Sequence, residues 1–576
     1  MIFHSPNEYS MKNLHNEWWR KATIYQIYPK SFCDSGGKGT GDIKGIISKL
    51  DYLQTLGVDA IWLTPIYCSP MIDNGYDISD YYNINPDFGD MADFETLLST
   101  AHQKGIRIIL DIVVNHTSTE HQWFQSALAD KNSPYRDYYI WQDPKKGAEP
   151  NNWQSKFGGS AWKFDQKSGQ YYLHLFAEQQ ADLNWENPQV RAEVENIISF
   201  WAEKGVDGFR LDVINLISKQ PSFPEDDSDG RKFYTDGPRA HQYLQRLSES
   251  VFNKYGSVTV GEMSSTSLAH CQQYSATDAT ELSMVFNFHH LKTDYKDGDK
   301  WTNAPLDLLQ LKQIFNYWQQ GMHDKGWSAL FWCNHDQPRI VSRFGDDKEY
   351  RVQSAKMLAS ALHMMQGTPY IYQGEEIAMT NPDYQLISQY RDLESINMHR
   401  IMLEQGKTEQ QVMAILASKS RDNSRTPMQW NKKEQAGFSD VQPWLEVASN
   451  YLDINVEAAL SDKNSVFYHY QKLLMLRKQL DVICWGDYQD LCPEHEQLFC
   501  YQRTIPEQKL LCINNFSSEQ VTYALPESLC LENTRVIIAN YNELERVDSN
   551  GQVINSLASK AITLRPFESL VLLEKV

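Results

Sequence analysis

The chain has 576 residues, of which 41% are hydrophobic, and this is enough apolar material for two or three packed domains. Its 74 acidic residues outnumber the 54 lysines and arginines, so the formal net charge is −20. This balance argues against a surface that binds nucleic acid or an anionic membrane, and any anionic substrate would need a local pocket of positive charge.

The start of the chain, Met-Ile-Phe-His-Ser-Pro-Asn, lacks the basic segment and apolar run of a secretory signal. No apolar stretch has transmembrane length. The nine cysteines are scattered and lack the paired close spacing of a zinc site, which favours a reducing compartment. We therefore predict a cytoplasmic protein with no metal and no cofactor. The sequence does not indicate an oligomeric state.

From Trp18 onward, amphipathic helical stretches end in glycine and are followed at once by short apolar strands. Near-continuous apolar strands that alternate with helices are typical of a parallel sheet covered on both faces. Eight such units predict an α/β fold, a (β/α)8 TIM barrel, whose chemistry lies at the C-terminal ends of the strands. The predicted strands cover residues 23–32, 59–65, 106–116, 206–215, 257–263, 283–288, 327–336 and 368–375.

Two long segments interrupt or follow these units. Residues 117–186 are rich in Trp, Tyr, Asn and Gly and are too long for an ordinary loop, so we predict an inserted subdomain after strand 3. From residue 490, short alternating segments broken by turn residues predict a C-terminal antiparallel β domain. We predict that residues 17–116 and 187–489 form the two parts of the barrel. Residues 117–186 form the inserted subdomain, and residues 490–576 form the C-terminal β domain.

The fourth predicted strand carries two opposite charges. Side chains alternate faces along a strand, so Arg210 and Asp212 point the same way. Burying charge costs several kcal/mol unless it is paired, and a structural Arg–Asp pair would satisfy this need. A catalytic carboxylate held by its arginine is the alternative, and this strand alone does not separate the two interpretations.

Other polar residues gather at the ends of the predicted strands. Strand three ends in Asn115-His116, strand five in Gly261-Glu262, and strand seven in Asn334-His335-Asp336. Each residue alone has an ordinary structural interpretation. Together they bring three carboxylates and two histidines to one barrel mouth, and a fold does not bury like charges together for stability.

A facing pair of carboxyl groups is what glycoside cleavage requires. One group, protonated, donates to the leaving oxygen, and the other, ionised, attacks the anomeric carbon or activates water. Arg210 beside Asp212 would keep Asp212 ionised, while Glu262 would remain protonated in a less compensated site. Aromatic rings around Tyr76, Trp153 and Phe157 are candidates for stacking on sugar faces.

Four short segments resemble the motifs of the α-amylase family in order and spacing: Asp-Ile-Val-Val-Asn-His (111–116), Gly-Phe-Arg-Leu-Asp-Val (208–213), Val-Gly-Glu-Met (260–263) and Asn-His-Asp-Gln (334–337). The resemblance implies that Asp212 is the nucleophile, Glu262 the general acid/base and Asp336 the transition-state stabiliser. It also implies that His116, Arg210 and His335 hold substrate. A covalent glucosyl–Asp212 intermediate would retain the anomeric configuration, with the carboxyl groups roughly 5 Å apart.

Two further segments, Asp73-Asn-Gly-Tyr-Asp77 and Arg421-Asp-Asn-Ser-Arg425, are similar to segments in the oligo-1,6-glucosidase-like branch of that family. In that branch an Asp–Arg pair closes the pocket behind the non-reducing glucose. The resemblance implies that Asp77 pairs with Arg425, that Tyr76 contacts the sugar, and that single glucosyl units are removed from chain ends.

Within this branch, residues 236–241, 261–267 and 286–292 resemble the members that hydrolyse trehalose 6-phosphate. The resemblance implies a sugar phosphate as substrate, whose dianion needs short-range charge-assisted hydrogen bonds in so acidic a protein. The candidates are Lys292, after the sixth strand, and Arg239, in the long loop after the fourth, with His289 and His290 as helpers. The alternative is that all four are solvated surface residues.

Three other functions remain open at this point. An oligo-1,6-glucosidase or general α-glucosidase would use the same machinery on neutral oligosaccharides. A glucosyl-transferring isomerase differs only in the access of water to the intermediate. A non-catalytic barrel associated with a transporter would need a transmembrane helix and would lack the carboxylates.

One loop near the N-terminus has the alternating spacing of a calcium loop, Asp34-Ser-Gly-Gly-Lys-Gly-Thr-Gly-Asp42. Gly36 and Lys38 stand at ligand positions, and an ammonium group has no lone pair to offer Ca²⁺. We therefore predict no tight calcium site, with Lys38 neutralising Asp34 and Asp42 in its place.

Overall fold

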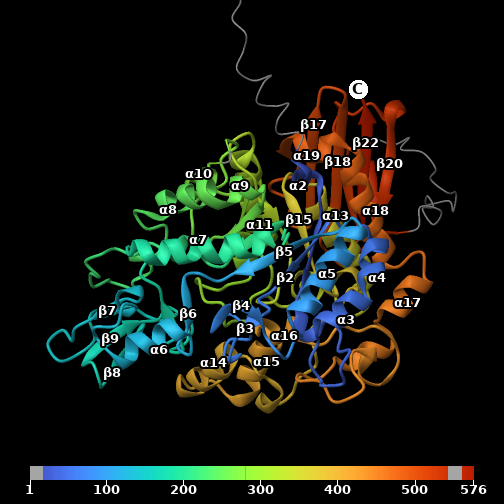
Figure 1. Cartoon of the computed structure of the whole chain (residues 1–576). Helices are drawn as coiled ribbons and strands as arrows, with labels where there is room; N and C mark the ends of the chain where they lie inside the picture. The colour runs from blue at the N-terminus through green and yellow to red at the C-terminus, as the bar shows by residue number, and fades with distance from the viewer. Residues whose placement is uncertain (1–16, 279, 542–560) are drawn as a thin grey trace, which may run out of the picture.

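The computed structural model describes residues 17–278, 280–541 and 561–576. At its centre is a parallel sheet of eight short strands (Figure 1). Each strand lies within one of the eight predicted ranges, so the predicted barrel is confirmed. The barrel strands are β1 (Ile24–Ile27), β2 (Ala60–Leu63), β5 (Arg107–Ile112), β11 (Gly208–Leu211), β12 (Val258–Glu262), β13 (Met284–Phe286), β14 (Ala329–Leu330) and β15 (Thr368–Tyr372).

The strands follow the order β13-β12-β11-β5-β2-β1-β15-β14. A parallel bridge between Val285 and Ser328 joins the two ends of this order and closes the sheet. In the register of the central strands, Arg210 of β11 lies beside Asp111 of β5 on one side and Val260 of β12 on the other. The C-terminal ends of β5, β11 and β12 are therefore neighbours.

Helices cover the outer face of the barrel. In α7, for example, the buried side chains of Val190, Val194, Ile197 and Trp201 recur at helical spacing and form one apolar face. No helix in the described ranges is long and apolar enough to cross a bilayer. The principal outer helices are α4 (Leu50–Leu56), α5 (Met91–Gln103), α7 (Pro188–Glu203), α8 (Ala240–Leu247), α10 (Leu268–Tyr274), α11 (Leu308–Met322), α13 (Arg351–His363) and α18 (Val466–Gln479).

The segment between β5 and α7 has its own secondary structure. Strand β9 (Gln170–Leu173) pairs with β7 (Trp141–Gln142) and β8 (Trp162–Asp165) in a small antiparallel sheet. Trp153 and Trp162 are buried in an apolar core that this segment shares with the loop after β11. Figure 1 shows the segment at the lower left, far from the C-terminal sheet at the upper right.

After β15 the chain forms three helices on the same side of the barrel as the inserted segment (Figure 1). They are α14 (Leu393–Glu404), α15 (Glu409–Lys419) and the short α16 (Asp422–Arg425). Buried Asp422 of α16 accepts backbone N–H bonds from Arg391 (2.6 Å) and Asp392 (2.8 Å), which ties α16 to the start of α14. This helical segment therefore forms a wall of the barrel mouth.

The C-terminal residues form an antiparallel sheet, as predicted. It begins at Asp487, three residues before the predicted boundary. Buried Lys312 of α11 donates hydrogen bonds to the carbonyls of Cys492 (2.7 Å), His495 (2.6 Å) and Leu498 (3.2 Å) and so joins the sheet to the barrel. The strands are β16 (Asp487–Asp490), β17 (Leu498–Ile505), β18 (Gln508–Asn515), β22 (Ser569–Lys575) and β20 (Thr534–Ala539), in spatial order.

The loop with calcium-like spacing differs from its prediction. The carboxylate of Asp34 accepts hydrogen bonds from the backbone N–H groups of Gly36 (3.0 Å) and Gly39 (2.7 Å) and from the Ser439 hydroxyl (2.6 Å). Asp42 caps the helix that follows it by accepting from the backbone N–H of Gly45. Among the described residues Lys38 pairs with neither aspartate, so its predicted role was wrong. Backbone and hydroxyl donors satisfy these carboxylates instead.

Candidate active site

Arg210 stands at the centre of the barrel mouth and contacts three carboxylates. Its Nη1 donates to Asp212 (2.6 Å) and to Asp111 (2.8 Å), and its Nη2 donates to Glu262. The guanidinium is 2% exposed, so these are charge-assisted bonds in a low-dielectric site. One arginine therefore fixes the positions of Asp212 and Glu262 relative to each other.

The backbone directs Asp212 into the mouth. Asp212 follows the last residue of β11, and its N–H donates to the carbonyl of Ile112 at 2.9 Å. Val213 then adopts a left-handed conformation with φ 36° and ψ 40°, which is strained for a β-branched residue. The chain thus turns away immediately after Asp212 and leaves its carboxyl group at the end of the strand.

Burial determines the acidity of these groups. It raises the pKa of Glu262 and of Asp212 to about 7 each, although the charge of Arg210 opposes both shifts. The prediction that Arg210 would compensate Asp212 and leave Glu262 less compensated was wrong, because the guanidinium reaches both groups. Asp212 and Glu262 also repel each other, so they titrate as a pair. The pair therefore holds one proton in an intermediate pH range.

The surroundings of Asp336 favour its ionised form, whereas those of Asp212 and Glu262 favour the protonated form. Its Oδ1 accepts hydrogen bonds from Arg425 (2.7 Å) and Arg421 (3.3 Å), and His335 Nε2 lies 3.4 Å from its Oδ2. These neighbours hold the pKa of Asp336 well below its usual range, although its partial burial alone would raise it. Its side chain is 32% exposed, so an ionised carboxylate faces the open mouth.

The two histidines at the mouth are held in place by neutral contacts. His335 stacks on Tyr76 with ring centroids 5.1 Å apart, and its Nδ1 lies 2.8 Å from Gln26 Nε2. His116 bonds the backbone carbonyl of Tyr76 at 3.1 Å. Burial lowers the pKa of His335 to about 3 and that of His116 to about 4, so both rings are neutral near pH 7. The Tyr76 hydroxyl donates to Asp111 at 3.0 Å.

The predicted Asp77–Arg425 pair was wrong. Asp77 is fully buried and accepts hydrogen bonds from the backbone N–H groups of Ile72 (2.8 Å) and Asp73 (3.0 Å), so it shapes its own loop. The ion pair across the mouth joins Asp73 and Arg421 at 3.4 Å. The two candidate aspartates, Asp73 and Asp77, lie four residues apart, and so do the two candidate arginines, Arg421 and Arg425. The sequence does not show which member of each pair faces the mouth.

The predicted aromatic residues divide between the site and the core. Phe157 lies at the site, since the guanidinium of Arg421 stands 5.0 Å from the centre of its ring. Trp153 is 1% exposed, and its ring stacks on Phe233, which lies in the loop between β11 and α8. It is therefore a core residue, and its predicted role in sugar stacking was wrong.

The four predicted phosphate contacts differ in their surroundings. Arg239 is exposed and pairs with Glu186, and His290 is buried, with Nε2 bonded to the Phe331 carbonyl at 2.8 Å. His289 packs its ring 5.1 Å from that of Trp318. Lys292 is exposed on a short helical turn, η6 (His289–Lys292), which follows β13. Arg239 and Lys292 are thus exposed, His289 is half-buried and His290 is buried, and the phosphate role of each stays a prediction.

Sequence reasoning missed several polar residues of the mouth, although most belong to motifs already singled out. Asp111 begins the first family motif. A carboxylate within an otherwise apolar strand is unusual, and this could have identified Asp111 as a residue of the site. Asp392 had no such signal, and it binds Arg421 at 2.5 Å. The missed residues are Asp73, Asp111, Asp392 and Arg421.

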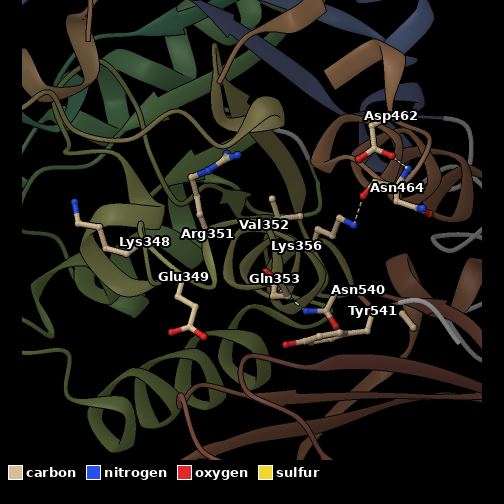
Figure 2. A pocket seen from close by; sticks show the side chains of 11 residues that line it. Lys348, Glu349, Arg351, Val352, Gln353, Lys356, Asp462, Asn464, Asn540 and Tyr541 are labelled. Carbon is tan, nitrogen blue, oxygen red and sulfur yellow. Dashed lines mark hydrogen bonds between the residues drawn. The ribbon is translucent and has the colours of Figure 1, made fainter. Parts of the chain in front are cut away.

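A separate cavity of about 520 Å³ lies between α13 and the C-terminal sheet. Its basic side chains do not converge: Figure 2 shows Lys356 turned toward Asn464, while Lys348 and Arg351 point in other directions. Arg351 donates to the backbone carbonyls of Ile377 (3.2 Å) and Ala378 (3.1 Å), and Lys356 to that of Asn464. These groups are already satisfied, so the barrel mouth is the better candidate site.

Comparisons with known proteins agree with this geometry. The family model described as alpha amylase, catalytic domain, matches residues 26–486, and that of the alpha-amylase SusG C-terminal domain matches residues 498–571. The chain is 58% identical to a trehalose-6-phosphate hydrolase of Escherichia coli and 56% identical to one of Bacillus subtilis, with 97% of this chain and 99% of the relative covered in each case.

Among solved structures, the trehalose-6-phosphate hydrolase of Bacillus licheniformis superposes with a TM-score of 0.92 at 56% identity, over 97% of this chain and 100% of that one. A family model that covers most of the chain and relatives of this similarity leave no doubt about its family. The chain belongs to the α-amylase family of glycoside hydrolases.

Proposed function

We propose that the protein is a retaining, exo-acting α-glucosidase that hydrolyses trehalose 6-phosphate to glucose and glucose 6-phosphate. The observation that carries this proposal is the pair of carboxyl groups, Asp212 and Glu262, held by one buried arginine at the mouth. The names of the similar hydrolases support the choice of substrate. The sugar phosphate is its small-molecule partner. We also propose a cytoplasmic location, which its nine free cysteines support.

In the first step Asp212, as carboxylate, attacks the anomeric carbon of the glucosyl unit. Glu262 donates its proton to the glycosidic oxygen, the bond between carbon and oxygen breaks, and glucose 6-phosphate leaves. The glucosyl unit remains as an ester of Asp212. In the second step Glu262 takes a proton from water, whose oxygen attacks the same carbon and releases Asp212 and glucose. Each step inverts the configuration at the anomeric carbon, so the two steps together retain it.

The remaining residues of the mouth hold the glucosyl unit. Asp336 remains ionised and accepts hydrogen bonds from sugar hydroxyls, and its charge stabilises the positive transition state. The remaining contacts to the glucosyl unit come from the neutral side chains of His116 and His335 and from the ring of Tyr76. The Asp73–Arg421 pair closes the pocket behind the glucosyl unit, a role that we transfer from Asp77 and Arg425. A closed pocket accepts only the end of a chain.

A substrate panel tests the proposed activity. We expect kcat/KM for glucose release from trehalose 6-phosphate to exceed that from trehalose, isomaltose, maltose and sucrose by at least tenfold. A preference for isomaltose or maltose would establish the neutral-sugar α-glucosidase instead. Isomerised disaccharide in place of free glucose would establish the glucosyl-transferring isomerase.

Replacing either carboxyl group should remove almost all activity. General acid–base catalysis alone contributes about 10²–10⁴-fold, so Asp212→Asn and Glu262→Gln should each lower kcat on trehalose 6-phosphate by at least that factor. The melting temperature and far-UV circular dichroism of both variants should remain close to wild type. Near-normal turnover by either variant contradicts its assigned role.

The pH profile should reflect the raised pKa of Glu262. Glu262 is protonated below its pKa of about 7 and loses its proton as the pH rises through that value, so kcat/KM should fall above pH 7. The profile is best measured with trehalose, which carries no group that titrates in this range and whose leaving sugar needs the proton of Glu262. A flat profile to pH 9 would exclude Glu262 as the proton donor.

The two aspartates of the 73–77 loop should behave differently. Asp73→Asn removes the charge that faces Arg421, and we expect kcat/KM to fall roughly 10- to 150-fold with little change in melting temperature. Asp77→Asn should lower the melting temperature, because its amide cannot accept every bond that the carboxylate accepts. The reverse result would restore the predicted pairing of Asp77.

A further inference from the structure

The side chain of Asn215 joins the chain after Asp212 to the chain after Glu262. Asn215 lies in the short turn η3 (Ile214–Leu216), just beyond Asp212. Its Nδ2 donates to the backbone carbonyl of Ser264 at 2.9 Å, and its Oδ1 accepts from the backbone N–H of Ser264 at 3.0 Å. Ser264 in turn lies just beyond Glu262. A reciprocal pair of hydrogen bonds therefore links the two segments that carry the proposed nucleophile and the proposed acid.

This link begins where the backbone ladder between the two strands ends. The last paired residues of β11 and β12 are Leu211 and Gly261. Within the described ladder of these two strands, neither Asp212 nor Glu262 belongs to a pair, so the ladder does not fix their separation. The Asn215 amide takes the place of the next pair, because it presents one donor and one acceptor to the opposite backbone as a strand residue does.

Asn215 is itself held from the outer side of the barrel. Its Nδ2 also donates to Asp236 Oδ1 at 3.0 Å, and the backbone N–H of Asp236 donates to the Asn215 carbonyl at 2.9 Å. Asp236 accepts a further bond at 3.0 Å from the hydroxyl of Tyr274, which ends α10. The Tyr274 ring stacks on that of His241 in α8, with centroids 4.2 Å apart. Two outer helices therefore fix the position of the amide.

The backbone on both sides of this link is strained. Val213, directly after Asp212, has φ 36°, and Ser265, directly after Ser264, has φ 54°. Non-glycine residues keep such conformations only where their surroundings over-determine them. Asn215 is 0% exposed, and its donor nitrogen and acceptor oxygen are both satisfied. The bonds of one buried amide thus stabilise two backbone turns that local preference disfavours.

We propose that Asn215 is a positioning residue that sets the separation of Asp212 and Glu262. This inference rests on the proposed function. Arg210 fixes the two carboxyl groups, and Asn215 fixes the backbones from which they extend. Both constraints are needed because Asp212 attacks the anomeric carbon while Glu262 protonates the oxygen bonded to that carbon. A change in the separation of the two carboxyl groups would misplace one of them.

The test compares two substrates that differ in their need for the proton of Glu262. The leaving sugar of trehalose 6-phosphate requires protonation, whereas α-glucosyl fluoride releases fluoride, a weak base that leaves without it. Asn215→Leu keeps the size of the side chain and removes all three of its hydrogen bonds. Because a misplacement of about 1 Å costs about 10²-fold, kcat/KM on trehalose 6-phosphate should fall by about that factor.

The decisive readout is kcat/KM on trehalose 6-phosphate divided by kcat/KM on α-glucosyl fluoride. A loss of folded protein, or a weaker attack by Asp212, affects both substrates and cancels in this ratio. Misplacement of Glu262 affects only the substrate that needs its proton. Asn215→Leu should therefore lower the ratio by about tenfold or more, since general acid catalysis contributes about 10²–10⁴-fold.

Asn540 offers a matched control. It is 4% exposed, donates to the carbonyls of Gln353 (2.9 Å) and Phe567 (2.6 Å), and accepts from the backbone N–H of Ser569 (2.8 Å). These bonds join α13 to the C-terminal sheet, at the end of the molecule away from α14 and α15 (Figure 1). Asn540→Leu should lower the melting temperature but leave the ratio within about twofold of wild type. An equal fall of the ratio in Asn540→Leu and Asn215→Leu would overturn the proposal.

The outcomes separate this inference from the proposed function. If wild type prefers isomaltose or maltose, the proposed substrate is wrong, and the ratio is measured with the preferred disaccharide instead. If wild type cleaves none of these sugars, the proposed function and the positioning role both fail. If Asn215→Leu keeps the wild-type ratio, only the positioning role is wrong. Should Asn215→Leu not fold, Asn215→Asp decides: it keeps the shape but loses both bonds that Nδ2 donates, so a wild-type ratio in this variant overturns the proposal.

Discussion

The organisation of the site depends on the guanidinium of Arg210. It is buried at the meeting point of β5, β11 and β12 and reaches one carboxylate from each strand end: Asp111, Asp212 and Glu262. Three carboxylates against one cation leave an excess of negative charge, which burial makes costly, so the group holds a proton at neutral pH. The proton that this excess of negative charge retains is the one that glycoside cleavage needs.

A second pair of arginines organises the other half of the mouth. Arg421 and Arg425 lie one helical turn apart, and both donate to Asp336, while Asp392 binds Arg421 from behind. Here two cations act on the carboxylate that faces the mouth, and its pKa falls instead of rising. Neighbouring carboxylates on one barrel thus differ in protonation because the ratio of cations to anions differs around each of them.

The sequence was sufficient for the barrel and for the central carboxylates, for a physical reason. Parallel strands covered on both faces are continuously apolar, so each charged residue at a strand end is conspicuous, and strand alternation places Arg210 with Asp212. Side chains in loops and short helices carry no such periodicity. Asp73 and Asp77, like Arg421 and Arg425, lie four residues apart, and only the loop fold shows that Asp77 turns inward. The sequence did not show that Arg239 is exposed and His290 is buried, because exposure and burial depend on packing between distant segments.

The distribution of charge around the mouth connects these observations to substrate choice. A net charge of −20 repels an anion at long range, but repulsion between exposed charges is screened beyond about 10 Å at moderate salt. Selection of a phosphate therefore depends on the few cations within reach of it. Lys292 is one exposed cation, on the turn that follows β13, where no periodicity in the sequence fixes the position of a side chain. The strands supply the bond-breaking groups, and loops between them determine which leaving group is accepted.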